Sequence, residues 1–273
     1  MTPSQHYPTK ALTLENIQKR LRSSIDDVSE EEMTIRTQLA ACYRLFDKFQ
    51  WTDMIYNHIT ARIPRKSEFL INPFGLLYHE MTASSLLRIN YKTHEVTHRG
   101  VVGDLLGANK AGYVIHSAIH EARSDINCVA HCHQQDVVAV ACDKRGLIIS
   151  NQQAQQLGPV TYHDYEGIVV DEREKETLVN DLGKGSKVIF LRNHGVLTCG
   201  ETIGEALVLM HYVIDACKIQ AKQGVSCDLI VPSEEIAQKT HSIAYSFNKE
   251  GVGAKELCAY MRQLDREDPS YRL

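Results

Sequence analysis

Short apolar runs alternate with segments of helical periodicity along most of this 273-residue chain, and this alternation limits the possible folds more than any other feature. The run INCVAHCH at 126–133 has the length and composition of a buried strand, as does KVIFLRNHG at 187–195. In the segment 111–123, apolar residues recur every three to four positions, as on one face of a helix. Because strands and helices alternate without strict βαβ units, we predict one α/β domain with three α/β/α layers and a central mixed sheet.

The same two periodicities predict the remaining elements. Helices are expected at 30–51, at 134–144, at 171–182, from the capping box Thr202–Glu205 onward, and at 232–263. Strands are expected at 55–63, 68–74, 146–150 and 160–165, with strands or turns at 88–100. No repeat or linker divides the chain, so we distinguish an N-terminal arm at 1–28 with a short helix at 14–21, a main domain at 29–230, and a C-terminal helical extension at 231–273.

Composition excludes several classes of function. The formal net charge is −4, whereas nucleic-acid binders carry clustered basic residues. No apolar run approaches the ~18 residues of a membrane helix, and the first residues lack the apolar core of a signal peptide. The eight cysteines contain no CxxC pair, and several lie within apolar runs, which suits free thiols in a reducing compartment. We therefore expect a cytoplasmic protein that binds neither nucleic acid nor membrane.

A pair of histidines in the strand at 126–133 is the sharpest chemical feature. Side chains two apart on a strand point to the same face, so His131 and His133 can bind one metal ion together. His194, which ends the apolar run at 187–195 and precedes a glycine, is the best candidate for a third ligand. Three histidines with an open fourth position describe a catalytic zinc site rather than a structural one.

Simpler explanations compete with each of these assignments. A His-x-His pair also fits a half-buried strand whose imidazoles bond to the backbone. His116 and His120, four apart on a predicted helix, are a rival metal pair, but without an HExxH pattern we favour packing for His120 and a pocket role for His116. Tyr162 is either a proton donor or one of the alternating aromatics of its strand. The remaining single histidines, His58 and His79 among them, fit surface or core positions.

Five motifs in order resemble the class II aldolase/adducin family. They are NHITARIP, FLINPFGLLYHEMTASSL, HSAIHEARSDINCVAHCH, GPVTYHDYEGIVVDE and LRNHGVLTCGETIGEAL, and the resemblance spans about 31–223. It implies a three-layer α/β/α fold, a homo-oligomer (tetramer or dimer), and a divalent metal ion, Zn²⁺ first with Fe²⁺ or Mn²⁺ as alternatives. It also maps the metal histidines of the family onto His131, His133 and His194.

The chain departs from the sugar-phosphate aldolases of this family at the positions that carry their chemistry. The glutamate that serves these aldolases as acid/base corresponds to Gly112, and the preceding serines correspond to Lys110 and Ala111. Two further phosphate contacts fall on His58 and Phe74. The resemblance therefore argues against sugar-phosphate cleavage. Motifs such as NHITARI and TASSL are closer to the adducin head, which is not thought to be an enzyme.

Two functions are compatible with these observations. The first is a metal-dependent lyase that cleaves a C–C bond or decarboxylates a small hydroxy or keto acid, and the resemblance implies as much because the superfamily includes decarboxylases. Decarboxylation also needs no base in place of the missing glutamate. Tyr162, His116 and Glu80, with His79, are the polar groups that we place near the ion. The alternative is a non-catalytic, adducin-like binding or scaffold protein.

The amphipathic region 232–263 is expected to gain stability by packing on another surface. That surface is either the protein's own sheet or a neighbouring subunit. In the second case Tyr245 or Tyr260 is a candidate to enter the neighbour's pocket and supply the proton that Gly112 cannot.

Overall fold

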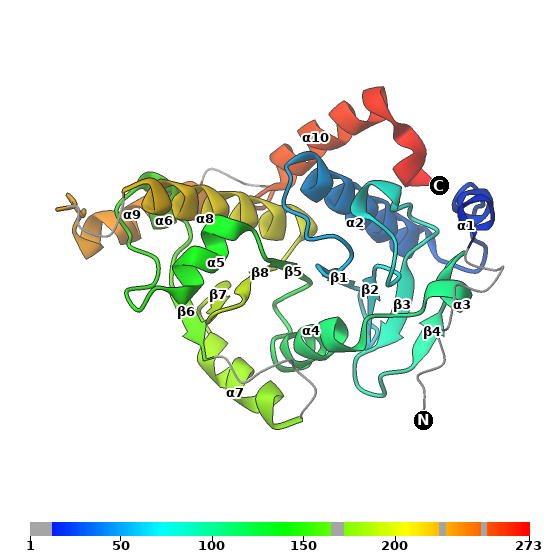
Figure 1. Ribbon diagram of the computed structural model, residues 1–273, viewed down its shortest axis with the longest axis horizontal. Helices are drawn as coiled ribbons and strands as arrows, with labels where there is room; N and C mark the ends of the chain where they lie inside the picture. The colour runs from blue at the N-terminus through cyan, green and yellow to red at the C-terminus, as the bar shows by residue number, and fades with distance from the viewer. Residues whose placement is uncertain (1–12, 165–171, 224–227, 247–249) are drawn as a thin grey trace, which may run out of the picture.

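The central element of the fold is a mixed sheet with helices on both faces (Figure 1). The computed structural model describes residues 13–164, 172–223, 228–246 and 250–273. Within these ranges the sheet has eight strands in the order β4-β3-β2-β1-β5-β8-β7-β6, antiparallel throughout except for the parallel pair β6–β7. The strands are β1 Ile59–Arg62, β2 Glu68–Ile71, β3 Leu87–Asn90, β4 Val96–His98, β5 Cys128–Cys132, β6 Val160–His163, β7 Val188–Leu191 and β8 Gly195–Gly200.

Helices form the two outer layers. Those with the most extensive packing are α2 Glu30–Lys48, α4 Lys110–Ala122, α5 Gln135–Cys142, α7 Glu172–Leu182, α8 Ile203–Gln223 and α10 Ala254–Glu267. The shorter or peripheral ones are α1 Leu14–Leu21, α3 Gly103–Leu106, α6 Gln152–Gln156, α9 Glu234–Ser246 and the 3₁₀ helices η2 Tyr78–Glu80 and η3 Pro269–Arg272. In Figure 1, α4 and α7 lie on one side of the sheet, whereas α2, α8 and α10 lie on the other.

The alternation of side chains along the strands divides the core into two parts. On β5, Cys128 and Ala130 belong to the cluster that α2 and α8 cover, whereas Val129 between them belongs to the cluster under α4 and α7. His131 follows Val129 by two positions and therefore shares its face. The predicted three-layer α/β/α architecture with a mixed sheet is thus confirmed.

Most predicted helices and strands are present, but residues 146–150 do not form the expected strand. Their backbone finds side-chain partners instead: the Leu147 N–H donates to the Tyr162 hydroxyl at 2.8 Å, and the Ile148 N–H donates to Gln220 Oε1 at 2.8 Å. The strand expected at 55–63 is limited to β1, which leaves a loop before it.

Several other expectations concern the ends of elements. The short helix expected in the arm forms as α1, whose N-cap Thr13 accepts a hydrogen bond from Asn16 N–H. The predicted cap Asp171 and residues 1–12 of the arm lie outside the described residues. None of the helices in the described ranges combines the length and apolarity needed to cross a membrane.

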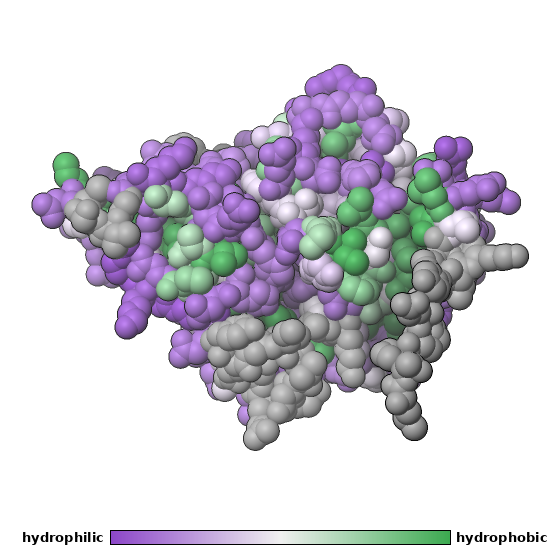
Figure 2. Space-filling view, viewed as in Figure 1, coloured by the Kyte–Doolittle hydropathy of each residue, from purple (hydrophilic) through white to green (hydrophobic). Residues whose placement is uncertain are grey.

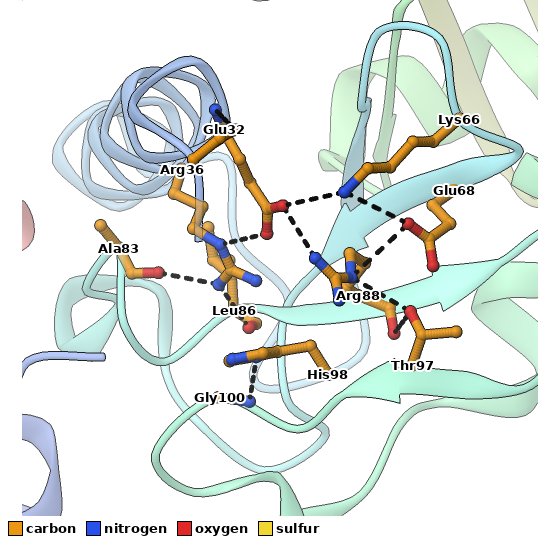
Figure 3. A network of polar contacts seen from close by, with 11 residues as sticks. Glu32, Arg36, Lys66, Glu68, Ala83, Leu86, Arg88, Thr97, His98 and Gly100 are labelled. Carbon is orange, nitrogen blue, oxygen red and sulfur yellow. Dashed lines mark hydrogen bonds and ion pairs between the residues drawn. The ribbon is translucent and has the colours of Figure 1, made fainter. Parts of the chain in front are cut away.

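A buried ion network ties α2 to the sheet edge formed by β2, β3 and β4 (Figure 3). Glu32 accepts hydrogen bonds from Arg36 Nε at 2.9 Å and from Arg88 Nη1 at 2.8 Å, and Lys66 and Glu68 extend the network outward. The side chains of Glu32 and Arg36 are at most 1% exposed. Burial raises the pKa of Glu32, but the two guanidinium groups outweigh it and hold that pKa below its usual value. We call these five residues the Glu32 network.

Candidate metal centre

Strands β5 and β8 bring the three predicted metal histidines to one edge of the sheet. Because these strands are antiparallel, the end of β5 meets the start of β8, with Cys132 opposite Val196. His133 follows β5 directly and His194 precedes β8 directly. Gly195 suits this close approach, since a Cβ there would lie 2.4 Å from the Cys132 carbonyl oxygen and 3.1 Å from His133 Cδ2.

The ring nitrogens of these histidines, hereafter the triad, converge on one point. His133 Nε2 lies 2.7 Å from His131 Nε2 and 2.9 Å from His194 Nε2, and the third separation is 3.4 Å. Nitrogens bound at 2.0–2.1 Å to one tetrahedral ion lie about 3.4 Å apart. One of the three separations equals this value and the other two are shorter by about 0.5 and 0.7 Å, so the nitrogens are close enough to share one ion. The imidazole donors suit Zn²⁺, Fe²⁺ or Mn²⁺.

In two members of the triad, the other ring nitrogen, Nδ1, is hydrogen-bonded to an oxygen atom of the protein. His131 Nδ1 lies 3.0 Å from the carbonyl oxygen of Val196, and His133 Nδ1 lies 3.1 Å from Asp53 Oδ2. A carbonyl or carboxylate oxygen in this position accepts a hydrogen bond from Nδ1–H, which leaves the Nε2 lone pair free to bind an ion. Asp53 comes from the loop between α2 and β1, and Cys132 Sγ donates to the Trp51 carbonyl of the same loop at 3.4 Å.

Burial keeps two imidazoles of the triad in the form that binds metals. Burial, followed by the neighbouring imidazoles, lowers the pKa of His131 well below its usual value. The same two causes lower the pKa of His194 to about 4. Both imidazoles are therefore neutral near pH 7, and neutral imidazole is the ligand form.

A second set of buried polar side chains starts beside the triad. The ring of His58, the residue before β1, lies 5.0 Å from the ring of His131 between centroids. His58 Nδ1 is hydrogen-bonded to His116 Nε2, His116 Nδ1 to Thr60 Oγ1, and Thr60 Oγ1 to His120 Nε2, each at 2.8 Å. All four side chains are buried. We call His58, His116, Thr60 and His120 the histidine chain.

The histidine chain forms because one side of β1 faces one side of α4. Positions 58 and 60 point to the same side of β1, and positions 116 and 120 lie one turn apart on α4 above that side. Burial lowers the pKa of His116 well below its usual value and that of His120 to about 3. The rings are therefore neutral, and the rival metal pair His116–His120 is joined through Thr60 instead.

The other predicted site residues contact groups outside the triad. Tyr162 lies on β6, its hydroxyl bonded to Leu147 N–H and its ring under the Arg192 guanidinium at 4.1 Å. The Glu80 carboxylate in η2 accepts the Leu77 N–H at 2.9 Å. His79 is exposed and lies 3.6 Å from Asp47. His116, described above, is connected to the triad through His58.

The C-terminal tyrosines contact their own chain. The Tyr260 ring on α10 packs on Phe49 with centroids 5.0 Å apart. The Tyr245 ring on α9 lies 5.5 Å from Lys187 Nζ. Helix α10 packs on α8 and α2, and α9 packs on α6, so both helices cover the protein's own elements in this structure.

Sequence reasoning missed His58 and Asp53 as members of the site. His58 was assigned to a surface or core position, although it and Gly112 both depart from the aldolase pattern. That pair of departures was the available signal, because the structure brings the two positions together. For Asp53 the sequence offers no such signal, because its loop has no periodicity and the position of its side chain depends on the path of the loop between α2 and β1.

Comparison with known proteins identifies the family. Residues 37–221 match the class II aldolase and adducin N-terminal domain. An adducin-related protein of Schizosaccharomyces pombe is 40% identical over 281 residues, covering 99% of this chain and 86% of that protein. Alpha-adducin of Rattus norvegicus is 47% identical over 247 residues, covering 86% of this chain and 33% of that protein.

A solved structure extends the comparison to the fold. The aldolase II superfamily protein from Pseudomonas syringae has a TM-score of 0.82 and 41% sequence identity, with 91% of this chain and 98% of that chain covered. The matched residues, 37–221, include the triad and the histidine chain. The protein belongs to the class II aldolase/adducin family.

Proposed function

We propose that this protein is a metal-dependent lyase of the class II aldolase type. The observation that carries the proposal is the convergence of three imidazole Nε2 atoms within 3.4 Å of one another. Apolar side chains would pack at this place at least as well as three imidazoles. In addition, Nδ1 of His131 and of His133 is hydrogen-bonded to a protein oxygen, as is usual for histidines that bind a metal. A divalent ion bound there supplies a Lewis acid for a carbonyl or carboxylate oxygen.

The proposed reaction is C–C bond cleavage or decarboxylation of a small hydroxy or keto acid. Gly112 has no side chain to move a proton, which disfavours cleavage of sugar phosphates by the route that uses a glutamate. His131 and His194 are neutral near pH 7, and the Asp53 carboxylate faces Nδ1 of His133, on the side of the ring away from the other two imidazoles. An anionic substrate therefore balances the charge of the ion better than a neutral one.

The experiment is a metal analysis of protein purified without chelators, followed by a screen of hydroxy and keto acids. We expect about one divalent ion per chain, loss of that ion in His133→Ala, and turnover of at least one acid by the wild type. His241→Ala, which changes a histidine bonded to the Gln156 carbonyl, is the matched control and should keep the ion. Wild-type protein that takes up no ion even when divalent metals are added would refute the proposal.

A non-catalytic, adducin-like binding module is the second candidate. It is favoured by Gly112 at the acid/base position together with the 47% identity to alpha-adducin. The two functions differ in one observable: a binding module keeps its fold and any ion but turns over none of the acids. Metal without turnover would therefore favour the second candidate.

We also propose that the chain forms a homo-oligomer, a tetramer or a dimer. Figure 2 shows hydrophobic side chains on the part of this face that Figure 1 draws around β1 and β2. Among the exposed large hydrophobic side chains are Met54, Tyr56 and Leu77, at 67%, 47% and 40%. Light scattering tests this: a mass of 30.8 kDa would identify a monomer.

A further inference from the structure

The space beside Gly112 is filled by the ring of His58. A Cβ at position 112 would lie 2.4 Å from His58 Cδ2 and 2.8 Å from His58 Nε2. Non-bonded carbons do not approach so closely, so any side chain at 112 requires the ring to move. The two departures from the aldolase pattern therefore depend on each other.

The ring of His58 is not free to move aside. Its Nδ1 is bonded to His116, its plane lies against His131, and its backbone carbonyl accepts the His131 N–H at 3.1 Å. Thr60 and His120 hold His116 in turn, so the whole histidine chain fixes the ring. Buried rings tied at one nitrogen and packed on one face have little rotamer freedom.

The other ring nitrogen of His58, Nε2, makes no hydrogen bond within the part of the chain that the structure describes, although Nδ1 does. It lies at the place where a residue-112 side chain would start, beside the triad. In the tautomer in which His116 Nε2 donates a hydrogen bond to His58 Nδ1, the neutral His58 ring carries its N–H at Nε2, and such a donor suits an anionic oxygen.

We propose that His58 is a specificity-determining residue of the metal site: it excludes a side chain at position 112 and donates a hydrogen bond through Nε2 to a carboxylate-bearing ligand of the bound ion. The proposal rests on the proposed function, because the ligand is held by the ion of the triad. It deepens that function by naming the group that distinguishes an acid substrate from the substrates of glutamate-dependent aldolases.

The steric half is tested without metal, by a double-mutant cycle on the apoprotein. Alanine stabilises a helix relative to glycine, so Gly112→Ala should raise the urea midpoint in the His58→Ala background. In the wild-type background the same substitution should lower it, because the ring cannot yield. The sign of the effect thus depends on residue 58. Equal midpoint shifts in both backgrounds would overturn the proposal, whatever the metal content.

The ligand half uses Co²⁺-loaded protein and oxalate, a small dicarboxylate, as the probe. His58→Phe keeps a ring without its nitrogens, and His58→Gln keeps a side-chain N–H without the ring. A hydrogen bond to a charged group predicts an oxalate Kd about tenfold or more weaker in His58→Phe, with part of the affinity restored in His58→Gln. The Co²⁺ affinity should stay within about twofold in both variants.

Each alternative result is informative. Unchanged oxalate affinity in His58→Phe would mean that the ring only fills space. A parallel loss of Co²⁺ in both variants would mean that His58 holds the ion, and would also overturn the proposal. Failure of the wild type to bind Co²⁺ would refute the proposed function instead, and the apoprotein cycle would still decide whether His58 excludes a side chain at 112.

Discussion

Two buried polar clusters in this protein offset the free-energy cost of burying polar groups in opposite ways. In the Glu32 network, the buried Glu32 carboxylate is paired with Arg36 and Arg88 at 2.8–2.9 Å, and Arg36 also donates to the Leu86 carbonyl. In the triad and the histidine chain, His58, His116 and His131 are neutral because burial lowers their pKa values. The hydrogen bonds and ion pairs of the first cluster join α2 to the sheet. The second leaves three Nε2 atoms of the triad facing one another, an arrangement that suits an ion.

The largest effect is expected from breaking the Glu32 network. Replacing Arg36 by methionine removes the fully buried guanidinium that pairs with Glu32 and leaves the carboxylate buried, so the free energy of unfolding should fall by about 3–5 kcal/mol. Urea denaturation measures this. The exposed pair Arg65–Glu31 is the matched control, and Arg65→Ala should cost about 0–1 kcal/mol. Similar losses in both variants would mean that burial does not distinguish the two pairs.

Removing the outer partner of the triad should weaken metal binding and leave folding nearly unchanged. Without Asp53, the ring of His133 loses the group that orients it, so Asp53→Ala should lower Zn²⁺ affinity about 10–100-fold. The lower end is expected because that carboxylate is 43% exposed. Competition with a chromophoric chelator measures the affinity. Asp143→Ala, which removes a carboxylate paired with Arg145, should not alter it.

Acid should distinguish the clusters by the pH at which stability begins to fall. The pKa of His120 is about 3 in the folded chain against 6.5 for an ordinary histidine. Between these values the unfolded chain takes up a proton that the folded chain does not, so stability decreases as the pH falls below 6.5. The slope is at most about 1.4 kcal/mol per pH unit for this group. The Glu32 pKa is lowered from 4.5, so its contribution is complete above that pH and is lost as the pH falls through the folded value.

Two variants of the metal-free protein separate these contributions. His120→Asn should flatten the dependence of unfolding free energy on pH between 6.5 and 4.5, whereas Glu32→Gln should flatten it only below 4.5. Parallel profiles for the two variants above pH 4.5 would show that His120 does not titrate differently in the folded and unfolded chains.

The amino-acid sequence determined the layers and the triad, because both depend on local periodicity. Alternation in β5 places His131 and His133 on the face opposite Cys132, and the end of an apolar run marks His194. Helical spacing likewise places His116 and His120 on one face of α4. The pairs His131–His133 and His116–His120 need no knowledge of which strands are neighbours, whereas His194 joins the triad because β8 pairs with β5.

Tertiary structure alone decided which side chains support the triad and which do not. His58 meets His131 because β1 pairs with β5 in one particular register, and it meets Gly112 because α4 crosses that pair. Asp53 reaches His133 only through the path of its loop. The Tyr162 hydroxyl accepts the Leu147 N–H, so this N–H in the segment 146–150 is bonded to a side chain rather than to a neighbouring strand. The physical reason is common to all of them: a side chain's partner is set by strand register and loop path, and these are long-range properties that local periodicity does not contain.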